Sequence, residues 1–99
     1  MHLDDATREK LEAAAFRALM HHLLEKRADV QNIDLMNLAG FCRNCLADWI
    51  RDAGAPYDKE GAREVIHGMA SSEWKQRFHR EATPRQLEAM AESLKKNAP

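Results

Sequence analysis

Apolar residues recur at helical spacing along most of the 99-residue chain, and no stretch alternates as a half-buried strand does. The first such segment predicts a helix from about Asp5 or Thr7 to about Arg27, preceded by acidic residues that suit the positive end of a helix dipole. His22 falls at the edge of its apolar face. At 100° per residue that face gathers Leu11, Ala15, Phe16, Leu19, Met20 and Leu23.

The second segment predicts one long helix from Ile33 to Ala53, with Asn32 as its N-cap and Gly54 just past its end. Apolar residues cover most of its circumference, and such a helix is normally buried on more than one side. Cys42 lies near the centre of its main apolar face and Cys45 near the margin. That face carries Leu35, Leu38, Cys42, Leu46 and Trp49.

Three shorter helices are predicted after Gly54. One runs from Asp58 to Met69 with His67 pointing outward, and one from Ser71 or Ser72 to Glu81. The last begins at Thr83-Pro84, a strong helix start, and frays over residues 95–99. Trp74 and Phe78 anchor the fourth predicted helix. The apolar stripe of the last helix consists of Leu87, Met90, Ala91 and Leu94.

The fold class is therefore all-α, a single helical domain over residues 1–99 in which two long antiparallel helices pack with about three short ones. So short a chain has a modest core. The predicted helix over residues 33–53 has more apolar surface than the rest of a 99-residue chain easily buries. The sequence thus predicts a homodimer, with Trp49 or Trp74 near the interface.

Composition excludes some classes of function. Charged residues make up 31% of the chain and the net charge is −1, which argues against nucleic-acid binding. No apolar run approaches the roughly 20 residues needed to cross a bilayer, so no membrane insertion is expected. The acidic N-terminus does not resemble a signal peptide. These observations predict a cytoplasmic protein, in which neighbouring cysteines stay reduced.

The sequence Cys42-Arg43-Asn44-Cys45 contains the only two cysteines and admits three interpretations. Residues three apart share a helix face, so both thiols can bind a zinc-like divalent metal, with His22 the best third ligand. Redox chemistry is disfavoured, because about ten residues of predicted helix separate Cys42 from the helix N-terminus, where a dipole lowers thiol pKa values. Packing as small buried hydrophobes is favoured over both.

A second candidate site is the segment from Asp29 to Gly40, which is rich in amides and carboxylates near a helix start. A helix N-terminus of this kind can hold a small polar ligand. Asn32, Asp34 and Asn37, together with the aromatic Trp49, are the candidate ligand-binding or partner-binding residues. The favoured alternative is that the polar residues of this segment cap the helix and fix the turn.

Several of these segments also resemble a known family. The run 29–49, with the segments 62–69, 73–75 and 81–84, resembles the DUF1244 family of short bacterial proteins of unknown function. His67 departs from the family pattern, where tyrosine is common. The resemblance implies a small helical bacterial protein and names no reaction, cofactor or substrate.

Two classes of function remain. The first is a non-enzymatic protein-interaction or structural module with a protein partner, and it is favoured because the sequence contains no recognisable catalytic constellation. The second class is a metal-binding or thiol-redox module that uses Cys42 and Cys45.

Overall fold

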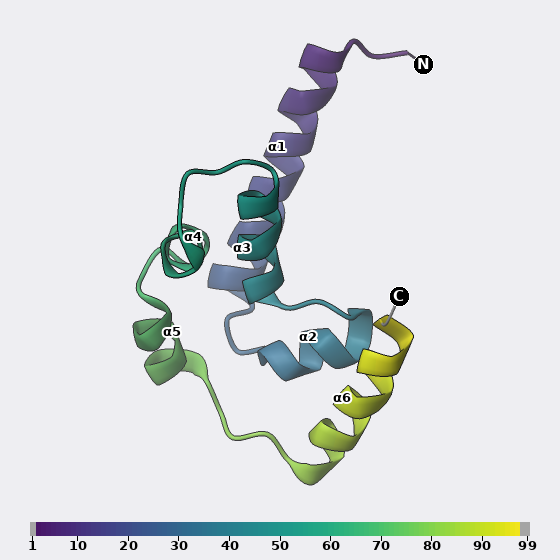
Figure 1. Cartoon of the computed structure of the whole chain (residues 1–99), viewed down its shortest axis with the longest axis vertical. Helices are drawn as coiled ribbons and strands as arrows, with labels where there is room; N and C mark the ends of the chain where they lie inside the picture. The colour runs from purple at the N-terminus through teal and green to yellow at the C-terminus, as the bar shows by residue number, and fades with distance from the viewer. Residues whose placement is uncertain (1, 98–99) are drawn as a thin grey trace.

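A computed structural model describes residues 2–97 of the chain, and within that range the protein is all-helical and contains no strand, as predicted. Residues 2–97 form six α-helices, and Figure 1 shows how turns and loops join them. The elements are α1 (Asp5–His21), the single π-helical turn η1 (His22–Lys26), α2 (Asn32–Ala39), α3 (Arg43–Asp52), α4 (Lys59–His67), α5 (Ser71–Phe78) and α6 (Pro84–Asn97).

The first predicted helix is present over the expected range, in two parts. Asp4 is the N-cap of α1 and accepts a 2.7 Å hydrogen bond from the backbone N–H of Thr7. After His21 the chain widens into the π-helical turn η1, which closes with a 2.8 Å bond from the Arg27 N–H to the His22 carbonyl.

The predicted helix from Ile33 to Ala53 is wrong, because the chain breaks into α2 and α3 at Gly40. Gly40 takes a left-handed conformation (φ 76°) that ends α2, and its N–H donates to the Met36 carbonyl at 2.9 Å. The backbone of Cys42 is extended, and α3 starts at the next residue. The N-cap of α2 is also Gln31 rather than Asn32.

The broken helix changes the packing expected of two long antiparallel helices. Helix α3 packs on α4, α4 lies beside α5, and α2 packs on α6 (Figure 1). The α2–α6 contact is largely polar: Asn37 Nδ2 donates to the Gln86 carbonyl at 3.1 Å, and the Ser93 hydroxyl donates to the Met36 carbonyl. Asn97 Nδ2 also donates to the Gly40 carbonyl, at 2.8 Å.

This polar contact overturns two expectations for the last helix. Ser93 is its buried residue, whereas Leu87 and Leu94 of the predicted apolar stripe are 50% and 49% exposed. Helix α6 continues to Asn97, so the predicted fraying does not occur over residues 95–97, and residues 98–99 lie outside the described range.

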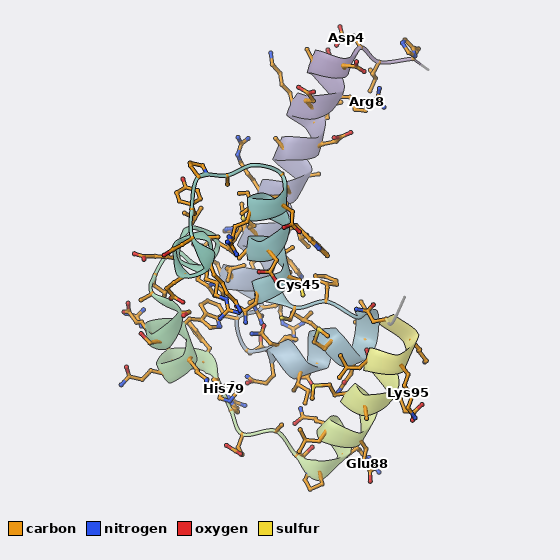
Figure 2. All side chains as sticks on the ribbon, in the orientation of Figure 1. Asp4, Arg8, Cys45, His79, Glu88 and Lys95 are labelled. Atoms are coloured by element: carbon orange, nitrogen blue, oxygen red, sulfur yellow. The ribbon has the colours of Figure 1, made fainter. Side chains whose placement is uncertain are left out.

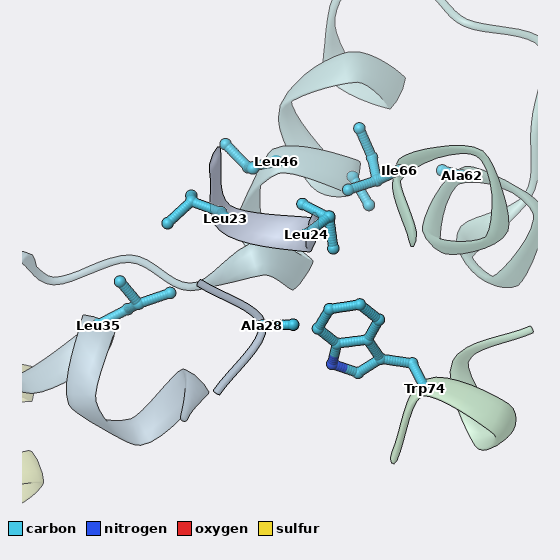
Figure 3. Packing of buried hydrophobic residues seen from close by; sticks show 9 residues of the cluster. Leu23, Leu24, Ala28, Leu35, Leu46, Ala62, Ile66 and Trp74 are labelled. Atoms are coloured by element: carbon cyan, nitrogen blue, oxygen red, sulfur yellow. The ribbon is translucent and has the colours of Figure 1, made fainter. Parts of the chain in front are cut away.

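The hydrophobic core lies where η1, α3, α4 and α5 meet (Figure 3). Trp74, predicted as an anchor of its helix, is 7% exposed and belongs to this core. Helix α1 contributes no buried residue. The core residues are Leu23, Leu24, Ala28, Leu35, Leu46, Ala47, Ala62, Ile66 and Trp74.

The short helices α4 and α5 begin close to the predicted positions. Asp58 is the N-cap of α4 and accepts a 2.7 Å bond from the Gly61 N–H. Helix α5 starts at Ser71 but ends at Phe78, three residues before the predicted end. The two helices form one wall of the cavity described next.

Candidate functional site

A cavity of about 430 Å³ lies between the start of α2, the start of α3, the face of α4 and the whole of α5. Its wall combines aromatic rings with a large share of nitrogen-bearing side chains. The lining residues are Ala28, Val30, Gln31, Asn32, Arg43, Asn44, Arg63, His67, Ser71, Ser72, Trp74, Lys75, Phe78 and His79.

Arg43 is the central residue of this wall, and it is 1% exposed. Its Nε donates to the Leu23 carbonyl at 2.9 Å and its Nη2 to the Arg27 carbonyl at 2.9 Å. Its Nη1 donates to the Val30 carbonyl at 2.7 Å and to Asn32 Oδ1 at 2.9 Å. All four acceptors are neutral oxygens, so the positive charge is held by dipoles rather than by a carboxylate.

The sequence explains why these carbonyls are available. Leu23 and Arg27 lie in and just after the last turn of the first helical segment, where carbonyls lack intrahelical partners. The C-terminal end of a helix also carries partial negative charge, which stabilises a cation. Four of the five guanidinium N–H groups bind these oxygens, and one Nη2 hydrogen has no acceptor within residues 2–97.

His67 lies beside Arg43 and is 6% exposed, which contradicts the outward position predicted for it. Its Nδ1 is 2.7 Å from the Arg63 carbonyl, so Nδ1 carries a proton and donates it. Its ring meets the Trp74 ring edge-on at 5.1 Å between centroids. Burial lowers the pKa of His67, and the charges of Arg43 and Arg63 lower it further, so the imidazole is neutral at pH 7.

Arg63 adds a second guanidinium to the wall. Its Nε is buried and has no hydrogen-bond partner in the described chain. Such groups are rare in native structures and carry a desolvation cost until an acceptor arrives. Lys75 of α5 and His79, which Figure 2 shows just past the end of α5, complete the basic wall.

No lining residue in the described range is Asp or Glu. The neighbouring carboxylate of Glu60 is already engaged, because it accepts bonds from the Ser71 hydroxyl at 2.6 Å and the Ser71 N–H at 3.2 Å. These bonds hold the pKa of Glu60 below its usual value. The described residues thus place no carboxylate in the cavity wall, while the nearby charges of Glu60 and Asp29 act on Arg63 and Arg43 from outside it.

The N-terminal ends of three helices add partial positive charge to the cavity wall. Gln31 and Asn32 belong to the start of α2, Asn44 to the first turn of α3, and Ser71 and Ser72 to the first turn of α5. The N-terminal end of a helix carries partial positive charge and unpaired N–H groups. Together with the basic side chains, this arrangement suits an anionic group such as a carboxylate or a phosphate.

The two cysteines lie on the same helix start but outside the cavity wall. Cys42 is the N-cap of α3 and Cys45 is three residues inside, so the predicted mid-helix position is wrong. Each sulfur accepts the other residue's N–H, with Cys42 N to Cys45 Sγ at 3.4 Å, and Figure 2 shows Cys45 in the first turn of α3. Both are free and half-buried, and burial raises the pKa of Cys42.

The predicted three-ligand metal set is not assembled within residues 2–97. His22 is exposed at the start of η1, and its side chain does not join the two thiols. Across the part of the chain that the structure describes, no group of three or more His, Cys, Asp or Glu side chains is placed to hold a metal ion.

Of the residues predicted to bind a ligand or partner, only Asn32 lines the cavity. Asp34 accepts bonds from the Gln31 N–H at 3.3 Å and Gln86 Nε2 at 2.9 Å, and Asn37 contacts α6, so both serve the α2–α6 contact. Trp49 is 53% exposed and lies 5.7 Å from the Phe41 ring. Sequence reasoning missed Arg43, Arg63, His67 and Lys75.

Over the residues that the structure describes, fold and site define a small all-helical protein with a basic cavity whose wall contains no Asp or Glu. The sequence model of a family described as protein of unknown function DUF1244 matches residues 30–92, and the chain belongs to this family. The matched segment contains every lining residue except Ala28, and it excludes α1. A search of curated proteins found no match to this chain. Among residues 2–97, no helix combines the length and apolar character needed to cross a bilayer.

Proposed function

We propose that this protein is a non-enzymatic interaction module that binds an acidic group of a partner protein in the cavity around Arg43 and Arg63. The observation that carries the proposal is the composition of the wall, which contains two Arg, one Lys and two His and no Asp or Glu in the described range. Such a wall favours an anion through charge-assisted hydrogen bonds.

The cavity wall is already in position to bind an anionic group. Arg43 is immobilised by four hydrogen bonds, so little side-chain entropy is lost when an anion arrives. Arg63 has a buried Nε that gains its missing acceptor. The rings of Trp74 and Phe78 supply apolar surface for the methylene groups of a Glu side chain.

The same wall supports a binding role over catalysis. Its polar groups are chiefly hydrogen-bond donors, and the Ser71 hydroxyl is engaged by Glu60. The thiols of Cys42 and Cys45 are the strongest nucleophiles of the chain, and neither lines the cavity. We place this module in the bacterial cytoplasm, where both thiols stay reduced.

Calorimetry with a hexaglutamate peptide tests the proposal. Binding is expected to weaken with salt, and the Arg63→Gln variant is expected to bind at least about tenfold more weakly. Arg77→Gln is the matched control, because Arg77 lies on α5 outside the wall and pairs with Glu73 at 2.6 Å. Absence of binding, or an equal loss in the two variants, would contradict the proposal.

Further arms of this experiment use glutamate and inorganic phosphate as free anions. Tighter binding of the peptide than of either anion supports a partner protein as the source of the acidic group. Equal affinity for free phosphate would instead indicate a small-molecule ligand.

The alternative proposal is a metal-binding or thiol-redox module built on Cys42 and Cys45. It is favoured by the position of Cys42 at a helix N-cap, where the dipole stabilises a thiolate. Burial of Cys42 acts in the opposite direction and raises its pKa. Oxidation would transfer two electrons from the two thiols to glutathione disulfide, releasing two glutathione molecules.

Two measurements test the alternative. Quantified thiols after equilibration with glutathione buffers give the reduction potential of the pair. Elemental analysis of the untagged protein gives its metal content. The interaction module is favoured if both thiols stay reduced at the reduction potential of the cytosolic glutathione pool and the protein contains less than about a tenth of an equivalent of zinc.

A further inference from the structure

Helix α1 is the least supported element of the fold. None of its residues is buried, and of its residues only Phe16 and Met20 pack against the core. Figure 2 shows Asp4 and Arg8 at its far end, well away from the other helices. Most of the stability of helices in proteins comes from tertiary packing of an amphipathic face, and this 17-residue helix has little of it within the chain.

An apolar stripe runs along the free side of α1. At 100° per residue, Leu11 lies about 140° from Phe16 and opposite Met20, the two residues that touch the core. Leu11 is 55% exposed and Leu19 is 39% exposed. Alanines between them allow a second helix to approach closely. The stripe consists of Leu11, Ala14, Ala15, Ala18 and Leu19.

The charges along this segment are divided between its two halves. Residues 2–12 contain four carboxylates and two cations, whereas residues 13–21, the second half of α1, contain no carboxylate and the single cation Arg17. Two copies in antiparallel orientation place the acidic half of each against the basic half of the other. A parallel arrangement would place like charges together.

We propose that the Leu11–Leu19 stripe is a docking surface for the α1 helix of a second copy of this chain, in antiparallel orientation. The contact is independent of the anion-binding cavity, because no residue of α1 lines that cavity. It also moves the homodimer interface expected from the sequence away from Trp49 and Trp74.

Light scattering coupled to size-exclusion chromatography tests the docking surface. The full chain is expected to elute with twice the 11.3 kDa monomer mass, and Leu11→Glu is expected to elute as a monomer. Leu87→Glu on α6 is the matched control, because Leu87 is similarly exposed, and it should remain dimeric. A native chain of 11.3 kDa at every concentration, or a Leu11→Glu variant that stays dimeric, would overturn the proposal.

Cross-linking tests the orientation in a background with both native cysteines changed to serine. Ala15→Cys lies near the midpoint of the stripe, so two copies should form an interchain disulfide under mild oxidation. Arg8→Cys lies toward one end of α1, so antiparallel pairing places the two introduced cysteines at opposite ends of the contact, where they should not form a disulfide. Equally efficient cross-linking at both positions would overturn the antiparallel arrangement, and so would cross-linking at Arg8→Cys alone.

Discussion

The guanidinium carbon of Arg43 lies 5.3 Å from the centre of the Trp74 ring, so the most buried cation of the cavity wall rests on the largest aromatic residue of the core. A cation at this distance is attracted by the ring quadrupole. The contact links α3 to α5, and the four hydrogen bonds of Arg43 link α3 to η1 and the start of α2. Arg43 therefore supports the fold and shapes the site.

Replacing Arg43 is expected to be severe. Arg43→Met should lower the free energy of unfolding by about 3–5 kcal/mol, because it leaves the carbonyls of Leu23, Arg27 and Val30 without their donor. Arg43→Lys should recover only part of this loss, since an ammonium group cannot reproduce the planar fork. Urea denaturation measures both.

The control for Arg43 is Arg63→Met. Its Nε has no partner to lose, so the change should cost less than about 1 kcal/mol. A loss equal to that of Arg43→Met would contradict the assignment of Arg43 as the structural guanidinium.

The α2–α3 break should depend on Gly40. A Cβ there would lie 2.5 Å from Asn97 Oδ1, and the left-handed backbone already disfavours a side chain. Gly40→Ala is expected to destabilise the protein by about 1–3 kcal/mol. Gly68→Ala is the control, because Gly68 has a similar φ of +72° with nothing within 4 Å. Thermal unfolding should rank Gly40→Ala as the more destabilised, and the reverse order would contradict this account of the α2–α6 contact.

Acidification should destabilise the protein through His67. Burial lowers its pKa in the folded state, so the unfolded state binds the proton more tightly. Stability is therefore lost as the pH falls from about 6.5 through the lower folded-state pKa. His67→Gln should flatten this part of the profile. Urea midpoints between pH 7.5 and 5 that fall equally in the native protein and in His67→Gln would argue against a buried neutral His67.

Alkylation should report the environment of Cys42. Burial raises its pKa, so the native thiol is protonated at neutral pH and should react with iodoacetamide more slowly than in urea. Mass spectrometry of the modified peptide gives the rate for each cysteine. A native rate for Cys42 equal to the rate in urea would mean that the thiol is accessible and activated, which favours the redox alternative.

Much of the fold follows from local pattern. Thr83-Pro84 starts α6 as predicted, with Thr83 Oγ1 accepting from the Gln86 N–H at 3.1 Å, and the short helices begin near their expected caps. The break at Gly40 was missed because helical periodicity continues on both sides of it. A glycine inside an apolar helical pattern does signal a possible C-cap.

The site could not be read from the sequence, for a different reason. Burying Arg43 requires oxygen acceptors from Leu23, Arg27 and Val30, and only the π-helical turn and the loop after it bring these carbonyls together. The local sequence around each of these residues does not predict that their carbonyls come together. His67 is similar, since its burial depends on Trp74 of the next helix. The mid-helix position predicted for Cys42 failed because of the same missed break.

Chemical-shift mapping by NMR, on the ¹⁵N-labelled native chain titrated with hexaglutamate, tests the anion-binding cavity most directly. The account predicts saturable shifts confined to the backbone amides of Asn44 and Ser72, the Arg63 Nε–H and the Trp74 indole, all within the cavity wall. A titration with no shifts, or with shifts spread over α1 and α6 while these four signals stay in place, would contradict it.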